Sequence, residues 1–243
     1  MRKLLALKIL LITALTFCLA GNSYSQTFVG VRAGGGASQL LNNLLNSFSK
    51  PDFYSTTFTY GAIGGVMFRH VAEPHLGFQA EINYLQRGFK QQLPEAIQNG
   101  EYIEAEYDYI QVPIMASIYA LQGKTKVFFN VGPYLAFGIS GTETVFQVEN
   151  FEKKSSKTTD IDFGSEDFDA FDYGLEAGLG LERRFEFGIL QVEGRFTWGM
   201  GNIYNADKPY YPDHTQNMTL GLTVNYLFQL DKGREKFDYV KKK

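Results

Sequence analysis

The stretch Asn217–Leu230, NMTLGLTVNYLFQL, decides the fold. Its even-numbered residues, from Met218 to Leu230, are all apolar, whereas most of its odd-numbered residues are polar or glycine. This alternation places apolar side chains on one face of a β-strand and polar side chains on the other. The stretch is long for a strand in a globular domain, where about five or six residues are usual. We therefore ask which two environments this strand separates.

Seven further segments alternate in the same way, so the sequence predicts eight strands. Short and longer connections follow each other strictly along the chain, which is typical of an up-and-down meander with its tight turns at one end. This pattern and the even strand count predict an all-β protein, an eight-stranded antiparallel up-and-down transmembrane β-barrel. The predicted short connections are 70–75, 120–125 and 184–188, and the longer ones are 37–56, 90–101, 140–170 and 201–216. The other seven predicted strands are 27–36, 57–69, 76–89, 102–119, 126–139, 171–183 and 189–200.

A soluble barrel with an apolar interior would show the same alternation, so the contents of the two faces must distinguish the two folds. Glycines beside a few charges of both signs suit the filled interior of an eight-stranded barrel. A water-facing exterior would instead favour many Lys and Glu residues and few glycines. Lysine is nearly absent from the predicted strands. We therefore predict that the polar face lines the interior, with these barrel-interior charges: Arg32, Glu81, Arg87, Glu176, Glu182, Glu193 and Arg195.

Aromatic residues on the apolar face gather toward the two predicted ends of the strands, with smaller or aliphatic residues between them. Bilayer interfaces select such aromatic girdles around an aliphatic band. The girdle nearer the long loops contains Phe58, Tyr60, Phe137, Phe171, Tyr173 and Trp198. The girdle nearer the tight turns contains Phe68, Phe78, Phe129, Tyr226 and Phe228.

The N-terminal sequence has the layout of a secretory signal peptide: Arg2, Lys3 and Lys8, then an apolar run, then small residues before Gln26. We therefore predict three parts: a signal peptide (1–25), the barrel (26–230) and a charged periplasmic tail (231–243). Removal of residues 1–25 deletes the single cysteine and leaves 20 Lys+Arg against 26 Asp+Glu. Without a basic patch, nucleic acid is not an expected partner.

Two resemblances extend this interpretation. The segment TLGLTVNY resembles the terminal-strand sorting signal of bacterial outer-membrane barrels, and it implies recognition by the barrel-assembly machinery during insertion. Its four defined positions are Thr219, Gly221, Val224 and Tyr226. The mature sequence also resembles the PorT-like small outer-membrane barrels of Bacteroidota, in segments such as YIQVPIMASIY, VFFNVGPYLAFGI and LQVEGRFTWGMGNI. This resemblance implies the fold and a place in the outer membrane of a Gram-negative cell, but it says little about function.

We considered several candidate sites for chemistry. His70 and His75 lie in a predicted tight turn, where a metal pair is a weaker interpretation than two surface histidines. The pair Asp213–His214 lacks the second acidic pair that outer-membrane aspartyl proteases need. The loop 141–169 holds eight acidic residues and three lysines, yet DIDFGSEDFD misses the spacing of a calcium-binding loop, so we predict a solvated acidic loop. We predict no catalytic, metal or cofactor-binding residues, and therefore no enzyme.

The predicted function is that of a structural or protein-interaction barrel. Its predicted location is the cell outer membrane, which it reaches after export to the periplasm. Outer-membrane lipid surrounds it, and envelope proteins are expected partners through the outer loops or the tail. A narrow passive channel for ions or small solutes is the first alternative. A hydrolase acting on envelope lipid is the second.

Overall fold

The computed structural model describes residues 26–42, 55–92, 99–120, 123–150, 152–163, 169–202 and 215–230. The predicted signal peptide, the predicted tail and His214 lie outside these residues. Within the part of the chain that is described, no helix is long and apolar enough to cross a membrane.

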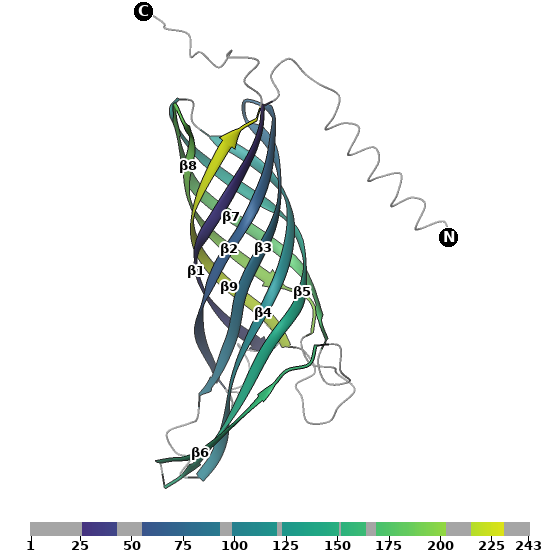
Figure 1. Ribbon diagram of the computed structural model, residues 1–243, viewed down its shortest axis with the longest axis vertical. Coiled ribbons are helices and arrows are strands. Elements are labelled where there is room, and N and C mark those ends of the chain that lie inside the picture. Colours follow the sequence, from purple (N-terminus) through teal and green to yellow (C-terminus); the bar gives the residue numbers. More distant parts are fainter. Residues whose placement is uncertain are drawn as a thin grey trace, which may run out of the picture.

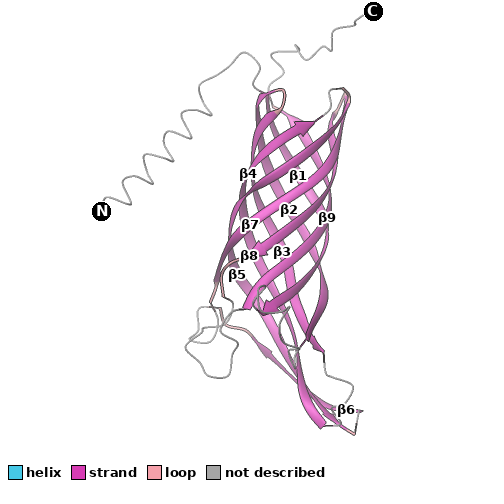
Figure 2. Cartoon of the chain, turned by 180° about the vertical axis from the view of Figure 1, so that it is seen from behind, coloured by secondary structure: helices cyan, strands magenta, loops and turns pink. Residues whose placement is uncertain are grey.

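Within these described residues, nine strands form one antiparallel sheet that closes on itself (Figures 1 and 2). Around the ring the order is β4-β3-β2-β1-β9-β8-β7-β5, and β4 pairs with β5 to close it, while β6 pairs outside the ring. The eight strands of the ring confirm the predicted barrel. The bounds are β1 (Gln26–Asn42), β2 (Ser55–Glu73), β3 (Leu76–Gln92), β4 (Asn99–Ala120), β5 (Thr125–Glu149), β6 (Glu152–Asp160), β7 (Phe171–Phe185), β8 (Gly188–Gly199) and β9 (Thr215–Gln229).

The start of β1, the end of β9 and the tight turns lie at one end of the barrel, drawn at the top of Figure 1. Glu73 pairs with Leu76 across one turn, and Phe185 pairs with Gly188 across another. Short turns of outer-membrane barrels face the periplasm and longer connections face the outside. We call the tight-turn end the inner end and the opposite end the outer end.

The structure corrects the prediction that residues 140–170 form one long loop. Strand β5 continues to Glu149, turns at Asn150 with a φ of 54°, and returns as β6. The outer part of β4 pairs with β5 out to Asn99, so three strands project beyond the barrel at the bottom of Figure 1. Thr142, Thr144, Val145 and Val148 of this part of β5 suit a strand, but the many charged residues of the segment are typical of a solvated loop. We call residues 99–107, 141–149 and 152–160 the protruding sheet.

A proline inside a strand predicts either a bulge or locally missing ladder bonds, and Pro113 and Pro133 show the second. The register between β4 and β5 is unchanged across Pro113 and Pro133, but the intervening pairs are missing from the ladder. A proline has no N–H to donate, which accounts for the gap. The bulge in this pair lies at Asp108/Tyr109 instead, close to where the barrel passes into the protruding sheet.

The two faces of the wall are inverted relative to a soluble barrel. Large apolar side chains such as Val31, Leu179 and Leu222 are more than half exposed on the outside, whereas arginine and glutamate side chains are buried inside. The glycines on the inner face make room for those side chains: a Cβ on Gly178 would collide with the carboxylate of Glu193. An apolar band of this extent requires hydrocarbon around it.

Aromatic rings cluster on the outer face at both ends. At the outer end Phe137 and Phe171 have ring centroids 5.2 Å apart. At the inner end Tyr226 packs edge-on against Phe228 at 4.5 Å and stacks with Phe187 at 6.2 Å. Rings in these positions are suited to the two interfaces of a bilayer.

Candidate functional site

All seven predicted interior charges point into the barrel and expose 6% of their surface or less. Two further charged residues lie with them, Arg69 and Asp172, so four arginines face five carboxylates among the buried residues that the structure describes. Both follow the same period-two pattern as their predicted neighbours, at odd positions in β2 and even positions in β7. That pattern was the signal that could have identified them.

The middle of the lumen is filled by a cluster centred on Glu81 of β3. Its carboxylate accepts hydrogen bonds from Arg32 of β1 at 2.5 Å and from Arg195 of β8 at 2.8 and 2.9 Å. Arg195 also donates to Glu193 at 2.6 Å and lies 3.6 Å from Glu176. We call these five residues the central cluster. Strands from opposite sides of the ring supply them, so the cluster crosses the lumen.

A second layer lies on the inner side of the central cluster. Arg69 donates to Glu182 at 3.0 Å and to Gln191 at 3.1 Å, and it also donates to Gln79. The guanidinium lies over the rings of Tyr119 and Phe128, 5.8 and 5.7 Å from their centroids. Buried charges of this kind are stable only when they are paired and hydrogen-bonded.

A third layer lies on the outer side. Arg87 donates to Asp172 at 2.9 Å and to Gln111 at 2.5 Å, and Tyr134 donates to the same Asp172 at 3.0 Å. The Arg87 guanidinium lies over the rings of Tyr109 and Tyr134. The three layers together place paired polar side chains across the middle of the lumen.

An apolar cluster of side chains covers this third layer on its outer side. Ile161 and Phe163, which directly follow β6, pack onto Tyr107 and Tyr109, with ring centroids of Phe163 6.1 and 5.8 Å from those of the tyrosines. The N–H of Ile161 donates to the carbonyl of Gly141 at 2.9 Å. We call Ile161, Phe163 and the residues beneath them the outer cap. The remaining members are Leu40, Phe89, Ile103, Ala105, Tyr107, Tyr109, Tyr134 and Ala136.

The outer cap explains part of the segment DIDFGSEDFD that suggested calcium. Its acidic residues Asp160 and Asp162 are exposed, whereas Ile161 between them is buried and Phe163 is half-buried. The alternation therefore anchors the segment on the barrel. No cluster of three metal-ligating side chains occurs in the described ranges, which omit residues 164–168 of this segment.

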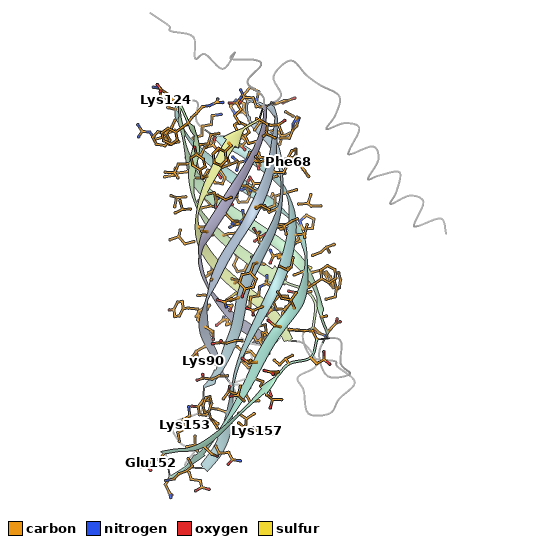
Figure 3. All side chains as sticks on the ribbon, viewed as in Figure 1. Phe68, Lys90, Lys124, Glu152, Lys153 and Lys157 are labelled. Carbon is orange, nitrogen blue, oxygen red and sulfur yellow. The ribbon has the colours of Figure 1, made fainter. Side chains whose placement is uncertain are left out.

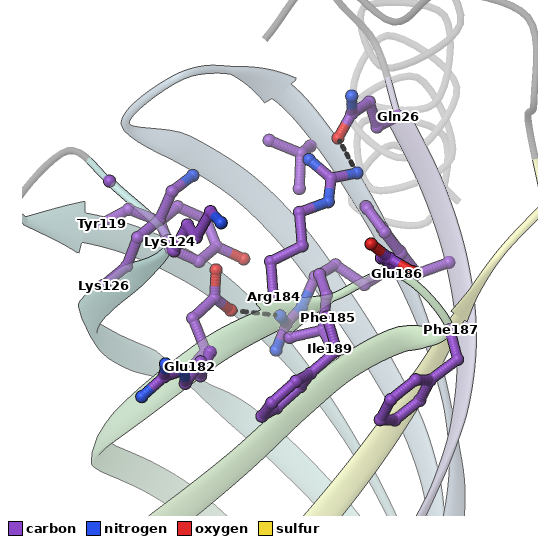
Figure 4. A pocket seen from close by; sticks show the side chains of 15 residues that line it. Gln26, Tyr119, Lys124, Lys126, Glu182, Arg184, Phe185, Glu186, Phe187 and Ile189 are labelled. Atoms are coloured by element: carbon purple, nitrogen blue, oxygen red, sulfur yellow. Dashed lines mark hydrogen bonds and ion pairs between the residues drawn. The ribbon is translucent and has the colours of Figure 1, made fainter. Parts of the chain in front are cut away.

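The inner end, in contrast, opens into a cavity of about 790 Å³ (Figure 4). We call this cavity the inner cup. Its floor is the layer of Arg69 and Glu182, and Figure 3 shows Lys124 at the same end of the barrel. The lining residues are Gln26, Phe28, Arg69, Val71, Tyr119, Gly123, Lys124, Lys126, Glu182, Arg183, Arg184, Phe185, Glu186, Phe187 and Ile189.

The two described histidines do not face each other. The Nδ1 atom of His70 lies 3.2 Å from the Thr27 hydroxyl, whereas the Nδ1 atom of His75 lies 3.1 Å from the Tyr119 carbonyl. Each ring is therefore engaged with a different neighbouring strand.

The residues of the predicted assembly signal divide between the two faces of β9. Thr219 and Gly221 point inward, while Val224 is 52% exposed on the outer face, where Tyr226 also lies. The Tyr226 hydroxyl donates to the carbonyl of Phe187 at 2.5 Å. Their role in insertion stays a prediction.

Comparison with known proteins places this fold in a family. Residues 24–205, well over half of the chain, match the family described as "Outer membrane protein beta-barrel domain". Among curated proteins no match is found. Similar solved structures include OprG from Pseudomonas aeruginosa, at 11% identity over 84% of this chain and 96% of that one with a TM-score of 0.43.

Neisserial surface protein A is another, at 10% identity over 84% of this chain and 99% of its own, with a TM-score of 0.40. Ail of Yersinia pestis is 12% identical over 84% of this chain and 99% of its own, with a TM-score of 0.38. The family match covers seven of the eight strands that form the ring, and β9 completes it. The chain therefore belongs to the outer membrane protein beta-barrel domain family, and it resides in the outer membrane.

Proposed function

We propose that this protein is a non-conducting, non-enzymatic barrel that binds another protein at the cell surface through the protruding sheet. The observation that carries the proposal is the edge strand β6, whose nine residues are all exposed and which pairs, within the described part of the chain, with β5 alone. An unpaired edge offers a row of N–H and C=O groups to a strand from another chain.

The backbone of β6 offers its free groups at defined positions. The N–H of Ile161 donates to Gly141, so in an antiparallel ladder the pairs Thr159/Glu143 and Lys157/Val145 are the hydrogen-bonded ones. The N–H and C=O groups of the residues between them, such as Thr158, therefore point away from β5. These outward groups are the ones that an added strand would use.

Lysines set the chemistry of this edge. Lys153, Lys154 and Lys157 lie on β6, and Figure 3 shows Lys153 and Lys157 on the projecting tip. Lysines on an edge oppose pairing of two identical edges, because like charges would meet. Lys154 is paired with Glu152 at 3.0 Å, whereas Lys153 and Lys157 have no ion pair among the described residues and can attract carboxylates of a partner strand.

The rest of the protruding sheet is built to hold β6 in place. Tyr102 stacks on Phe146 at 4.7 Å, and the Lys153 ammonium lies 3.2 Å from the centroid of the Phe146 ring. These contacts stabilise the three strands outside the membrane, where neither the lumen nor lipid supports them. A stiff edge loses less entropy when a partner strand is added.

The filled lumen supports the non-conducting part of the proposal. The central cluster bridges the ring and the outer cap lies over one end. An eight-stranded barrel has just enough room for its own side chains. Purified protein in planar lipid bilayers should therefore show no single-channel steps, and clear steps would support the passive-channel alternative instead.

A finer assignment rests on sequence segments. YIQVPIMASIY and VFFNVGPYLAFGI support placing the chain among PorT-like barrels of Bacteroidota, exported by a signal peptide that is cleaved before Gln26. The mass of the mature protein tests that cleavage site. The hydrolase alternative predicts an altered lipid A mass profile in a deletion strain, whereas an interaction barrel leaves that profile unchanged.

The edge itself is tested by two substitutions at Thr158. Thr158→Pro removes one outward N–H while leaving the hydrogen bonds to β5 in place. Thr158→Val keeps the N–H but loses the hydroxyl contact to Thr144, which is 2.9 Å long. The measurement is the amount of a surface partner that copurifies with the protein from gently solubilised membranes. We expect this amount to fall several-fold with Thr158→Pro and to stay unchanged with Thr158→Val. Equal recovery with both variants would overturn edge binding.

A further inference from the structure

The inner cup has the size of a ligand site and lies at the inner end of the lumen. Its volume of about 790 Å³ lies within the range of about 300–1,000 Å³ usual for ligand pockets. Its lining includes Phe28, Arg69, Tyr119 and Glu182, which occupy inward-facing strand positions. A ligand therefore enters from the periplasm and not from the surrounding lipid.

We propose that the inner cup binds an acidic peptide segment of a periplasmic partner, with its carboxylates at Lys124 and Arg184 and an apolar side chain against Phe28 and Ile189. This site is independent of the protruding sheet, which lies at the other end of the molecule (Figure 1).

The charges of the cup carry the first step of the argument. Five cationic side chains line it against two carboxylates. Glu182, the carboxylate at the floor, is already engaged by Arg69 at 3.0 Å and by Gln191 at 2.8 Å. A net positive cup remains, and its low-dielectric walls strengthen its attraction for anions.

Two of these cations are available for an anionic ligand. Among the described residues neither Lys124 nor Arg184 has a carboxylate within ion-pair distance. The Arg184 guanidinium instead donates to the neutral amides of Gln26 at 3.3 Å and Gln229 at 2.6 Å. As Figure 4 shows for Gln26, these amides hold the guanidinium at the cup without neutralising it. A held guanidinium can bind a carboxylate at little further entropic cost.

An apolar wall beside the cations makes the cup amphipathic. Phe28 and Ile189 pack with Met67 and Leu227, and half-buried Val71 lies against them. A free phosphate would leave this wall unused, whereas a peptide with acidic and apolar side chains fills both halves. The chain's own tail does not fit the charge, since residues 231–243 carry six basic and three acidic residues.

The test measures peptide binding to the purified mature protein in detergent by fluorescence anisotropy. The probe is a fluorescein-labelled Gly-Asp-Glu-Phe-Asp-Glu peptide, and its charge-reversed control is Gly-Lys-Arg-Phe-Lys-Arg. We expect saturable binding of the acidic probe, weakened by added NaCl, and none of the control peptide. The double variant Lys124→Gln/Arg184→Gln should lose affinity for the probe by a factor of about ten or more.

A matched variant removes the same charge from the other end. Lys153→Gln/Lys157→Gln should bind the probe as the wild type does. Heat-modifiable gel migration checks that each barrel is folded, and Lys124→Glu alone keeps the test valid if the double variant does not fold. Equal affinity for both peptides, or an unchanged affinity in the Lys124 variants, overturns the proposal. Displacement of the probe by phosphatidylglycerol vesicles would overturn it in favour of a lipid headgroup site.

Discussion

At the outer end of the lumen Ile161 and Phe163 lie on tyrosine rings, whereas at the inner end a cavity of about 790 Å³ is lined by lysine and arginine side chains. Between the two ends the central cluster crosses the ring through Glu81. The same wall of strands thus carries an apolar cap at one end and a cavity lined by cationic side chains at the other. This difference underlies the proposal that a ligand reaches the lumen from the inner end.

The comparison also separates what each end does. Strand β6 continues directly into Ile161 and Phe163 of the outer cap. One segment of the chain therefore belongs both to the protruding sheet and to the cap. The inner cup is formed instead by strand ends and short turns, which are constrained by the barrel itself. A partner at one end therefore does not require a partner at the other.

The largest expected effect is on the stability of the barrel, when the central cluster between the two ends loses its shared carboxylate. Glu81→Ala leaves Arg32 and Arg195 buried without their shared carboxylate. Removing one partner of a buried ion pair costs about 3–5 kcal/mol, so the midpoint of urea unfolding from lipid vesicles should fall strongly. The control is Glu152→Ala, whose exposed pair with Lys154 is 3.0 Å long and is worth less than about 1 kcal/mol. Equal losses from the two variants would contradict a stabilising central cluster.

A smaller effect is expected from opening the outer end. Phe163→Ala removes a half-buried ring from two tyrosine contacts and should cost about 1–3 kcal/mol, less than the 3–5 kcal/mol typical of a fully buried phenylalanine. Phe187→Ala, at a ring that is 69% exposed at the inner end, should cost less. Both are measured by urea unfolding. If Phe187→Ala costs as much as Phe163→Ala, the outer cap does not stabilise the barrel.

The smallest expected effect concerns pH at the protruding sheet. Partial burial raises the pKa of Glu143, which lies on β5 outside the membrane-spanning part. Because the folded state then holds this proton more tightly than the unfolded state, the stability of the sheet should fall as pH rises through the raised pKa. Amide exchange of β5 and β6 measures this, and Glu143→Gln should remove the dependence. A dependence of opposite sign would contradict the burial of this carboxyl group.

Much of the wall could be predicted because strand side chains alternate with a period of two. In β7 the outward residues from Phe171 to Leu181 and the inward residues from Asp172 to Glu182 lie where that period puts them. The same alternation places Arg69 and Asp172 on the inner face, but it does not predict which buried charges pair with each other. That depends on which strands face each other across a closed ring, such as β3 and β8 at Glu81 and Arg195.

The protruding sheet and the inner cup could not be predicted in this way. The outer part of β5 and the whole of β6 carry charged and hydroxyl residues without a regular apolar alternation, so no apolar face distinguishes these strands from a solvated loop. The cup joins residues from β1, β2, β4, β5, β7 and β8, which are remote in sequence.

The sequence by itself therefore determined the barrel, its lipid-facing side and its polar interior, because each strand records its own two environments residue by residue. Only the tertiary structure decided how the lumen is closed and where it stays open. Closure depends on pairs such as Arg32 with Glu81, and Phe163 with Tyr109, that exist only once the ring has brought distant strands together.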